Sequence, residues 1–355
     1  MIRPKQADTL NLDMSYTYAS INLDSLDSSW KDLQHHLNWS SVFVLPRWLK
    51  VWWQVFGEGP KLYLYDVKED KNVIGIAPLM VKESEASFIG SADVCDYMDF
   101  VITPGKELPF FTAVLDKLKR DGIKELCLDS LRHDSTVIDF LVDIAKGKGY
   151  EVTVSRQNVS LDLDLPSTWD EYLRTLSPKQ RRETGRRFRR LEEEGDVNYR
   201  IVESAKPEVL DIFFKLMRES REDKAAFMTP QMESFFRALA QTMAEARMLR
   251  LGVLEISKRP VAAVMCFDYN HKVYLYNSGY DPEYGYLSAG LLSKLLSIKD
   301  SIERGRKCYD FLKGAEEYKY RLKGREIGIF NCKVQIGKCK VWGHFANIER
   351  TVDDA

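Results

Sequence analysis

Residues 272–314 read KVYLYNSGYDPEYGYLSAGLLSKLLSIKDSIERGRKCYDFLKG, and this stretch decides the fold. The alternation of side chains over 272–279 predicts a β-strand, and the residues rich in Gly, Pro and Tyr that follow predict a loop. A helix is expected over 289–304 and a second strand at 308–312. The buried face of this helix consists of Leu291, Leu295, Ile298 and Ile302. A strand, a helix and a further strand in this order are typical of an α/β fold.

Strands and helices alternate in the same way along the rest of the chain. Period-2 alternation predicts strands, and apolar residues three and four apart predict helices. Strands are expected at 16–24, 61–68, 73–81, 124–131, 151–165, 197–203, 247–256, 260–269 and 328–342. Helices are expected at 46–56, 107–120, 135–146, 168–176, 178–194, 207–221 and 230–245.

A short repeat indicates two related halves. Cys127–Leu131 and Cys308–Leu312 share the pattern C-x-D-x-L, and each follows a predicted helix and a predicted strand pair. The matching order of elements gives this short pattern its weight. A chain of 355 residues is also long enough for two domains. We therefore expect an N-terminal domain over 1–160 and a C-terminal domain, which carries the site, over 161–355.

Composition excludes several classes of protein. The formal net charge is -1, so no overall field attracts DNA or anionic lipid. No stretch has the ~20 apolar residues of a membrane span, and the first residues lack the apolar core of a secretory signal. The six cysteines are scattered and the histidines lack metal-ligand spacing. We expect a cytoplasmic protein with reduced thiols and no metal.

The most basic segment is the predicted helix at 178–194. Ser177, Pro178 and Gln180 form a capping box with proline in the first turn. Arg182, Arg186 and Arg190 lie four residues apart and form one positive stripe. Arginines at the start of a helix and glutamates at its end oppose the helix dipole, which hints at an anionic ligand. The alternative is a solvated helix stabilised by the pairs Arg189–Glu193 and Arg190–Glu194.

Two further segments carry candidate site residues. Ser288 is the expected N-cap of the helix at 289–304, and the small residues Ala289 and Gly290 would let a phosphate approach the first-turn amides. An ordinary capped helix explains the same pattern. Asp310, in a buried strand followed by Gly and a cluster of Glu, Tyr and Lys, is typical of a cleft at the end of a strand. Structural roles are open for this cluster as well.

The order of these motifs resembles the GNAT domain of CelD/BcsL-type acetyltransferases, which are relatives of the Fem aminoacyl transferases. The basic helix is followed by G-Y-D-P (Gly279–Pro282), S-A-G-L-L (Ser288–Leu292), Y-D-F-L-K-G (Tyr309–Gly314) and Y-K (Tyr318–Lys319). The match covers about residues 165–320, and the N-terminal half fits more loosely. The resemblance implies two tandem GNAT-like domains, each with a mixed, mostly antiparallel sheet flanked by helices.

The resemblance also implies a role for each candidate. Acetyl-CoA or another acyl-CoA would lie between two splayed strands, with its pyrophosphate on the amides at Ser288, Ala289 and Gly290. The oxyanion would be held by a backbone amide of the splayed strand, around Cys266 and Phe267. The catalytic candidates are Asp310 as general base, Asp281 as its substitute, and Tyr280 or Tyr318 as proton donor to the CoA thiolate. The candidates for the acceptor are Lys319, Arg182 and Arg186.

The expected function is acyl transfer to an amine or hydroxyl of a small-molecule or saccharide acceptor in polysaccharide or cell-envelope biosynthesis. Residues 284–290 do not reproduce the usual GNAT pyrophosphate loop, Gln/Arg-x-x-Gly-x-Gly/Ala. Two alternatives therefore stay open. One is a non-catalytic, degenerate GNAT protein that binds a sugar nucleotide or acidic glycan, and the other is a Fem-like transferase that uses aminoacyl-tRNA.

Overall fold

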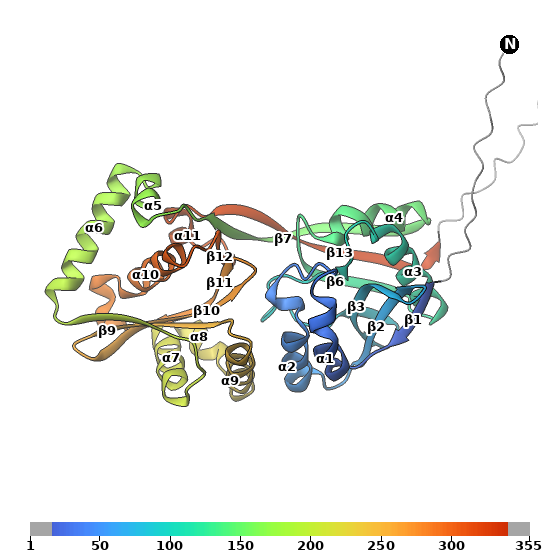
Figure 1. Cartoon of the computed structure of the whole chain (residues 1–355), viewed down its shortest axis with the longest axis horizontal. Helices are drawn as coiled ribbons and strands as arrows, with labels where there is room; N and C mark the ends of the chain where they lie inside the picture. Colours follow the sequence, from blue (N-terminus) through green and yellow to red (C-terminus); the bar gives the residue numbers. More distant parts are fainter. Residues whose placement is uncertain (1–15, 340–355) are drawn as a thin grey trace, which may run out of the picture.

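A computed structural model describes residues 16–339, and their strands form one mixed sheet with helices on both faces (Figure 1). The strand order is β1-β2-β3-β4-β6-β13-β7-β12-β11-β10-β9-β8, and β5 pairs with β3. The strands are β1 (Tyr16–Ser20), β2 (Lys61–Glu69), β3 (Asn72–Lys82), β4 (Glu85–Phe88), β5 (Val101–Ile102), β6 (Glu125–Arg132), β7 (Tyr150–Asp164), β8 (Val197–Val202), β9 (Leu249–Ile256), β10 (Arg259–Tyr269), β11 (Lys272–Tyr280), β12 (Cys308–Lys313) and β13 (Arg325–Cys339).

The helices cover the sheet in two groups, which Figure 1 shows as two lobes. The first lobe holds α1 (Leu23–Leu33), α2 (Pro46–Phe56), α3 (Glu107–Arg120) and α4 (Val142–Gly147). The second lobe holds α5 (Trp169–Thr175), α6 (Pro178–Glu193), α7 (Pro207–Ser220), α8 (Glu222–Phe227), α9 (Pro230–Glu245), α10 (Ala289–Glu303) and α11 (Glu317–Arg321). None of the helices within residues 16–339 is long and apolar enough to cross a membrane.

The two lobes repeat one strand arrangement. In the first lobe β2, β3 and β4 are antiparallel neighbours and β6 is parallel to β4. In the second lobe β9, β10 and β11 are antiparallel neighbours and β12 is parallel to β11. The repeated C-x-D-x-L pattern lies on β6 and β12, which are the equivalent strands. The prediction of two related halves is thereby confirmed for the fold.

The last strand of each repeat is exchanged with the other lobe. β7 follows the first lobe in the chain but pairs with β12, and β13 follows the second lobe but pairs with β6. These two long strands also pair with each other from Arg325↔Asp162 to Cys339↔Tyr150. Figure 1 shows them running between the lobes. The expected boundary at residue 160 falls inside β7, so the two lobes share strands across it.

Two apolar clusters pack on opposite faces of the second lobe's strands. One lies between these strands and α10 and includes Tyr309 and Phe311. The other continues into the first lobe, where the Trp48 ring of α2 meets the rings of Phe267 (5.5 Å) and Tyr276 (5.3 Å) edge-on. Burial of these large rings stabilises the contact between the lobes.

Local sequence explains most element boundaries. Pro46 and Pro178 occupy first-turn positions of α2 and α6, and Ser177 and Gln180 form the predicted capping box. The strand expected at 16–24 ends at Ser20, because Asn22 caps a helix there. The helix expected at 135–146 begins as a π-turn (Val137–Leu141) before α4. Residues 340–342 of the last expected strand lie outside the described residues.

Candidate active site

The sheet opens between β11 and β12. These parallel strands pair only at Lys272↔Cys308, Val273↔Tyr309 and Tyr274↔Asp310. β11 continues to Tyr280 and β12 to Lys313 without pairing with each other, so no ladder bonds join these two strands beyond Tyr274 and Asp310. An opening of this kind gives an extended ligand access to backbone donors and acceptors.

A β-bulge distorts β11 at this opening. Leu275 pairs with Cys266 and Asn277 with Met265, which leaves Tyr276 without a partner residue on β10. A bulge re-aims backbone groups, which is a common feature beside active sites. The expectation that Cys266 and Phe267 lie in the splayed strand is wrong. Both are fully buried in β10, which pairs with β9 on one edge and β11 on the other.

The first turn of α10 lies at the end of this opening. Ser288 adopts a left-handed conformation (φ 60°, ψ 39°) and its side chain does not cap the helix, contrary to the expected N-cap bond. Leu291 and Leu292 donate their amides to the Ser288 carbonyl. Within residues 16–339 the amides of Ala289 and Gly290 have no acceptor, although both residues are buried. Free amides at a helix N-terminus are suited to an anion.

Tyr280 and Asp281 border the same turn. A Cβ atom on Gly290 would come within 2.8 Å of the Tyr280 ring, so this glycine allows the helix to rest on the tyrosine. Asp281 is buried and both of its oxygens are engaged. One accepts the amide of Glu283 (3.0 Å) and the other accepts from Arg259 (2.8 Å). This carboxylate therefore caps the loop that leads to α10.

Lys319 of α11 closes the end of β12. Lys319 is 2% exposed, and its ammonium donates to the carbonyls of Leu312 (3.0 Å), Lys313 (2.8 Å) and Gly314 (3.0 Å). It also pairs with Glu316 at 2.8 Å. The hydrogen-bonding capacity of the ammonium is thus filled by oxygens of the chain itself. The predicted contact of Lys319 with the acyl-acceptor substrate would require some of these hydrogen bonds to be exchanged.

Two other lysines at the opening were missed by the sequence analysis. Lys294 of α10 is buried, donates to the Gly290 carbonyl (2.9 Å) and lies 5.0 Å from the centre of the Tyr318 ring. Lys224 of α8 donates to Asn277 (3.0 Å) and to the carbonyl of Ser278. Burial lowers the pKa of Lys294 to about 7 and that of Lys224 to about 8. Burial also raises the pKa of Tyr318.

Asp310 lies at the point where the strands separate and is fully buried. Its Oδ1 accepts from the hydroxyl of Tyr97 in the first lobe (2.7 Å) and from the amide of Leu312 (2.8 Å). Its Oδ2 has no hydrogen bond but lies 3.6 Å from Lys272 Nζ and 3.8 Å from Arg132 Nη1. Burial raises the pKa of Asp310 to about 7, and repulsion from the Asp162 carboxylate is the second cause of this rise. A carboxyl group with this pKa can exchange protons at neutral pH.

A segment of the first lobe lies across the opening on the face away from α10. The Val94 carbonyl accepts from the Tyr276 hydroxyl of β11 (3.1 Å), and the Asp96 carboxylate accepts from the Lys313 amide of β12 (3.0 Å). Together with Tyr97, which reaches Asp310, this segment contacts both splayed strands. The first lobe therefore contributes directly to the site, which no sequence motif indicated.

Two arginines of the predicted stripe, Arg182 and Arg186, line a cleft, whereas the third, Arg190, lies outside its lining. This cleft of about 950 Å³ lies between α6, the first two turns of α10 and the end of α11. Its cations are Lys179, Arg181, Arg182, Arg186, Arg187, Arg189 and Arg321, and its floor includes Leu291 and Leu295. Glu183 pairs with Arg186 (2.8 Å) and Arg187 (3.1 Å), in place of the expected pairs toward the end of the helix. Arg182 has no ion pair within residues 16–339.

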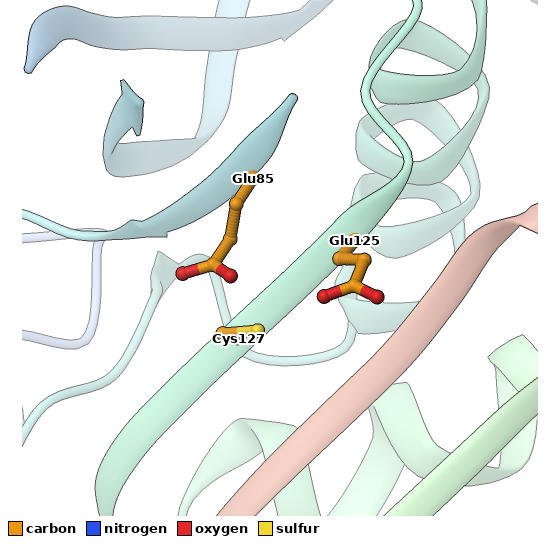
Figure 2. Close-up of side chains that lie close together, drawn as sticks. All are labelled: Glu85, Glu125 and Cys127. Atoms are coloured by element: carbon orange, nitrogen blue, oxygen red, sulfur yellow. The ribbon is translucent and has the colours of Figure 1, made fainter. Parts of the chain in front are cut away.

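One group of side chains in the described part of the chain has the composition of a metal site. Glu85, Glu125 and Cys127 come together on β4 and β6 of the first lobe (Figure 2). Lys333 (2.6 Å) and Gln335 (2.9 Å) already bind Glu125. Burial raises the pKa of Cys127 to about 12, so the thiol holds its proton at neutral pH. These partners suit a sheet surface better than a metal centre.

Comparisons with known proteins agree with this geometry. Residues 178–320 match the acetyltransferase (GNAT) domain family. The structure is similar to that of FemX (TM-score 0.60, 12% identity, 89% of this chain and 96% of that chain). A conserved protein of unknown function from Bacteroides thetaiotaomicron VPI-5482 is also similar (TM-score 0.60, 11% identity, 90% and 100%).

A third similar structure is the C-terminal domain of a putative lysylphosphatidylglycerol synthetase from Agrobacterium fabrum (TM-score 0.50, 9% identity, 74% of this chain and 80% of that chain). No curated protein matches the sequence. The matched residues 178–320 run from α6 through α11 and include β11, β12 and α10. Most of the second lobe therefore matches an acetyltransferase (GNAT) domain, and the chain is similar in overall fold to FemX.

Proposed function

We propose that this protein transfers an acyl group from acyl-CoA to an amine or hydroxyl of a saccharide or other small acceptor. The observation that carries the proposal is the opening between β11 and β12, which ends at the buried, unbonded amides of Ala289 and Gly290. A pantetheine arm fits an extended opening, and a pyrophosphate suits free amides at the start of a helix. The CelD/BcsL resemblance of this segment supports a role in polysaccharide or cell-envelope biosynthesis.

The transfer would be direct. The acceptor nitrogen or oxygen attacks the thioester carbonyl and forms the new bond, while the carbonyl oxygen takes the negative charge. A β11 amide near the bulge at Tyr276 would hold this oxyanion, in place of the β10 amides expected from sequence. Asp310 takes the proton of the acceptor. The C–S bond then breaks, and Tyr318 or Tyr280 returns a proton to the CoA thiolate.

One observation favours aminoacyl-tRNA as an alternative acyl donor. The arginine-lined cleft beside α10 is larger and more basic than a single pyrophosphate needs, which suits the polyanionic aminoacyl-tRNA of the Fem-like alternative. Activity that disappears after RNase treatment would support this donor. The acyl-CoA reaction is unaffected by RNase.

The first test is titration of acetyl-CoA, longer acyl-CoAs and desulfo-CoA, followed by thermal unfolding and calorimetry. A ligand at ~100 times its Kd should stabilise the protein by about 2.7 kcal/mol. Gly290→Val should weaken binding at least ~10-fold, because its side chain would displace the Tyr280 ring and fill the space beside the amides. Gly285→Ala is the matched control, because no atom lies within 4 Å of its new Cβ.

Release of free thiol in the presence of amino sugars then separates an enzyme from a non-catalytic protein. CoA binding with thiol release supports the proposal. Saturable sugar-nucleotide binding without any CoA binding would instead support the glycan-binding alternative.

A further inference from the structure

Two lysines reach the opening between β11 and β12 from opposite faces of the sheet. Lys224 lies on α8, which covers one face together with α7 and α9, and Lys294 lies on α10, which covers the other face (Figure 1). Lys224 donates to the Ser278 carbonyl of β11, and Lys294 donates to the Gly290 carbonyl of α10. Gly290 rests on the ring of Tyr280, two residues along β11 from Ser278. The two ammonium groups therefore lie at the same end of the opening.

Neither ammonium group has a carboxylate partner within residues 16–339. Lys294 is 8% exposed, and in this part of the chain its one hydrogen bond goes to the Gly290 carbonyl. Lys224 is half-buried and has two acceptors, Asn277 and the Ser278 carbonyl. An ammonium group has three N–H donors, so both lysines keep donors free. Lysine is rarely buried without a charged partner, and this pair is therefore suited to an anion.

Lys319, the third lysine of the opening, differs from these two. Its ammonium is filled by three carbonyls at the end of β12 and by the Glu316 carboxylate at 2.8 Å. Glu316 is near enough to raise the pKa of Lys224 and of Lys294, but it is about half exposed and is already paired. One carboxylate thus serves three ammonium groups, and the local charge is positive. Partial burial strengthens the attraction of such a site for an anion, because the effective dielectric is low.

The position of the two lysines favours an anion on a reacting group. Asn277 and Ser278, which bind Lys224, directly follow the bulge at Tyr276, whose amide is proposed to hold the thioester oxyanion. Two residues of a strand span ~7 Å, so the Lys224 ammonium lies about this far along β11 from the reacting carbonyl. The CoA phosphates are assigned to the first-turn amides of α10. The common anion on an acyl group or on a saccharide is a carboxylate.

We propose that Lys224 and Lys294 form a carboxylate-binding site beside the reacting groups, so that one of the two reactants is acidic. The inference rests on the proposed acyl transfer and narrows it. Either the acyl group ends in a carboxylate, as malonyl does, or the acceptor carries one, as a uronic acid does. Each ammonium donates to one carboxylate oxygen, and the carboxylate takes no part in bond making. The two lysines thus determine which reactants bind.

Calorimetric titration with two matched pairs of ligands tests the site. Malonyl-CoA is compared with isovaleryl-CoA, whose acyl group has the same shape but no charge, and D-galacturonate is compared with D-galactose. We expect the acidic member of at least one pair to bind ~10-fold more tightly or better, because hydrogen bonds between charged groups are the strong ones. Preference for malonyl-CoA assigns the carboxylate to the acyl group, and preference for galacturonate assigns it to the acceptor. No preference in either pair would overturn the proposal.

Two variants with matched controls locate the preference. Lys224→Gln keeps an N–H donor but loses the charge, and Lys294→Met loses the ammonium group. Each should reduce the preference to less than ~3-fold, or under ~0.7 kcal/mol. Lys215→Gln, exposed on α7, and Lys299→Met, half-buried on α10, should leave it unchanged. Thermal unfolding checks that each variant folds. Folded Lys224→Gln and Lys294→Met variants that keep the wild-type preference would overturn the proposal.

Proton uptake gives a readout that a purely structural role would not change. Burial and the nearby Lys224 lower the pKa of Lys294 to about 7, so at pH 8 most of this amine is neutral in the free protein. The other titratable groups that face it are those of Lys319, Glu316, Cys266 and Tyr318. A bound carboxylate favours the ammonium form, so binding at pH 8 should take up a proton from the buffer.

Titration in HEPES and in Tris, which differ in heat of ionisation, measures this uptake. Lys299→Met should keep the uptake and Lys294→Met should lose it. Binding of the acidic ligand without proton uptake in wild-type protein would overturn the assignment of Lys294.

Titration with desulfo-CoA separates this inference from the proposed function. If wild-type protein binds desulfo-CoA but shows no preference in either pair of ligands, the carboxylate inference alone fails. If it binds galacturonate through the two lysines but binds no CoA compound, the proposed donor fails and the carboxylate site stands.

Discussion

The hydroxyl of Tyr97 donates a 2.7 Å hydrogen bond to Asp310 Oδ1, and both side chains are fully buried where the lobes meet. The two residues are 213 positions apart in the sequence. The bond ties the candidate base of the GNAT domain to a loop of the other lobe. The first lobe thus acts on the chemistry of the site by stabilising the charged form of this carboxylate.

Tyr97→Phe should shift the acidic limb of the pH–rate profile upward. The hydroxyl lowers the pKa of Asp310, and its loss raises that pKa further because a bond to a charged group is worth roughly 1.5–3 kcal/mol. A shift of about one pH unit is expected, since one unit corresponds to about 1.4 kcal/mol. The plateau rate at high pH should change only a few-fold. Tyr63→Phe, which removes an exposed bond to Asp121, is the control.

An unchanged limb in Tyr97→Phe would mean that Asp310 does not titrate in the rate-limiting step. Acyl-transfer rates from pH 5 to 9 give this result directly.

Asp310→Asn should lower turnover by about two to four orders of magnitude, which is the contribution of a general base. The repeat supplies its control. Asp129 holds the equivalent place in the C-x-D-x-L pattern of β6 but is exposed, so Asp129→Asn should leave turnover unchanged. Circular dichroism checks that both variants fold. A folded Asp310→Asn variant with full turnover would remove this residue from the mechanism.

The sequence predicts the elements of this protein well, because most of them are set locally. The strand pairs, the helices at Pro46 and Pro178, and the repeat on β6 and β12 depend on periodicity and capping within about 20 residues. Lys294 also left a signal, since it lies among the leucines of the buried face of α10. A charged residue on such a face needs an explanation.

The junction between the lobes could not be predicted in the same way. The contact of Tyr97 with Asp310 and the exchange of β7 and β13 depend on pairings between distant segments. The register of a strand pair at such distances is set by packing and not by a local pattern. For the same reason the splayed strand was expected around Cys266 and Phe267 of β10, whereas the structure opens the sheet between β11 and β12.

Lys294→Met should stabilise the protein most at low pH. Burial lowers the pKa of Lys294 to about 7, so between pH 7 and about 10.5 the unfolded chain binds one proton more than the folded chain. The free energy of unfolding of wild type therefore rises with pH across this window, by up to about 1.4 kcal/mol per unit. Methionine has no proton to lose, so this pH dependence disappears in the variant. The free energy by which the variant exceeds wild type should therefore shrink as pH rises.

Urea unfolding at pH 6.5, 8 and 9.5 measures this effect. Lys299→Met is the control, because Lys299 lies on the same helix but is only half-buried and pairs with Glu303. A stability difference between Lys294→Met and wild type that does not vary with pH would contradict the low pKa.

Gly279→Ala should destabilise the protein by about 3 kcal/mol, the upper end of the range for overpacking. A Cβ atom at Gly279 would lie 2.2 Å from the backbone nitrogen of Met217 in α7, and backbone cannot move aside as a side chain can. Gly285→Ala, in the loop that follows, has open space and is the control. Thermal unfolding compares the two. Similar melting temperatures would show that α7 does not pack this closely on β11.

Arg182→Gln combined with Arg186→Gln should weaken CoA binding about 10-fold at low salt. The structure puts both arginines in the cleft beside the first turns of α10, where CoA phosphates at Ala289 and Gly290 would extend, and not at the junction between the lobes. Charges at a few ångströms in an exposed cleft interact strongly only at low ionic strength, so the loss should shrink at 0.5 M salt. Arg156→Gln with Arg174→Gln removes the same charge from exposed positions outside the cleft. An unchanged Kd for CoA, with weaker binding of an anionic acceptor, would return the arginines to the acceptor role predicted from sequence.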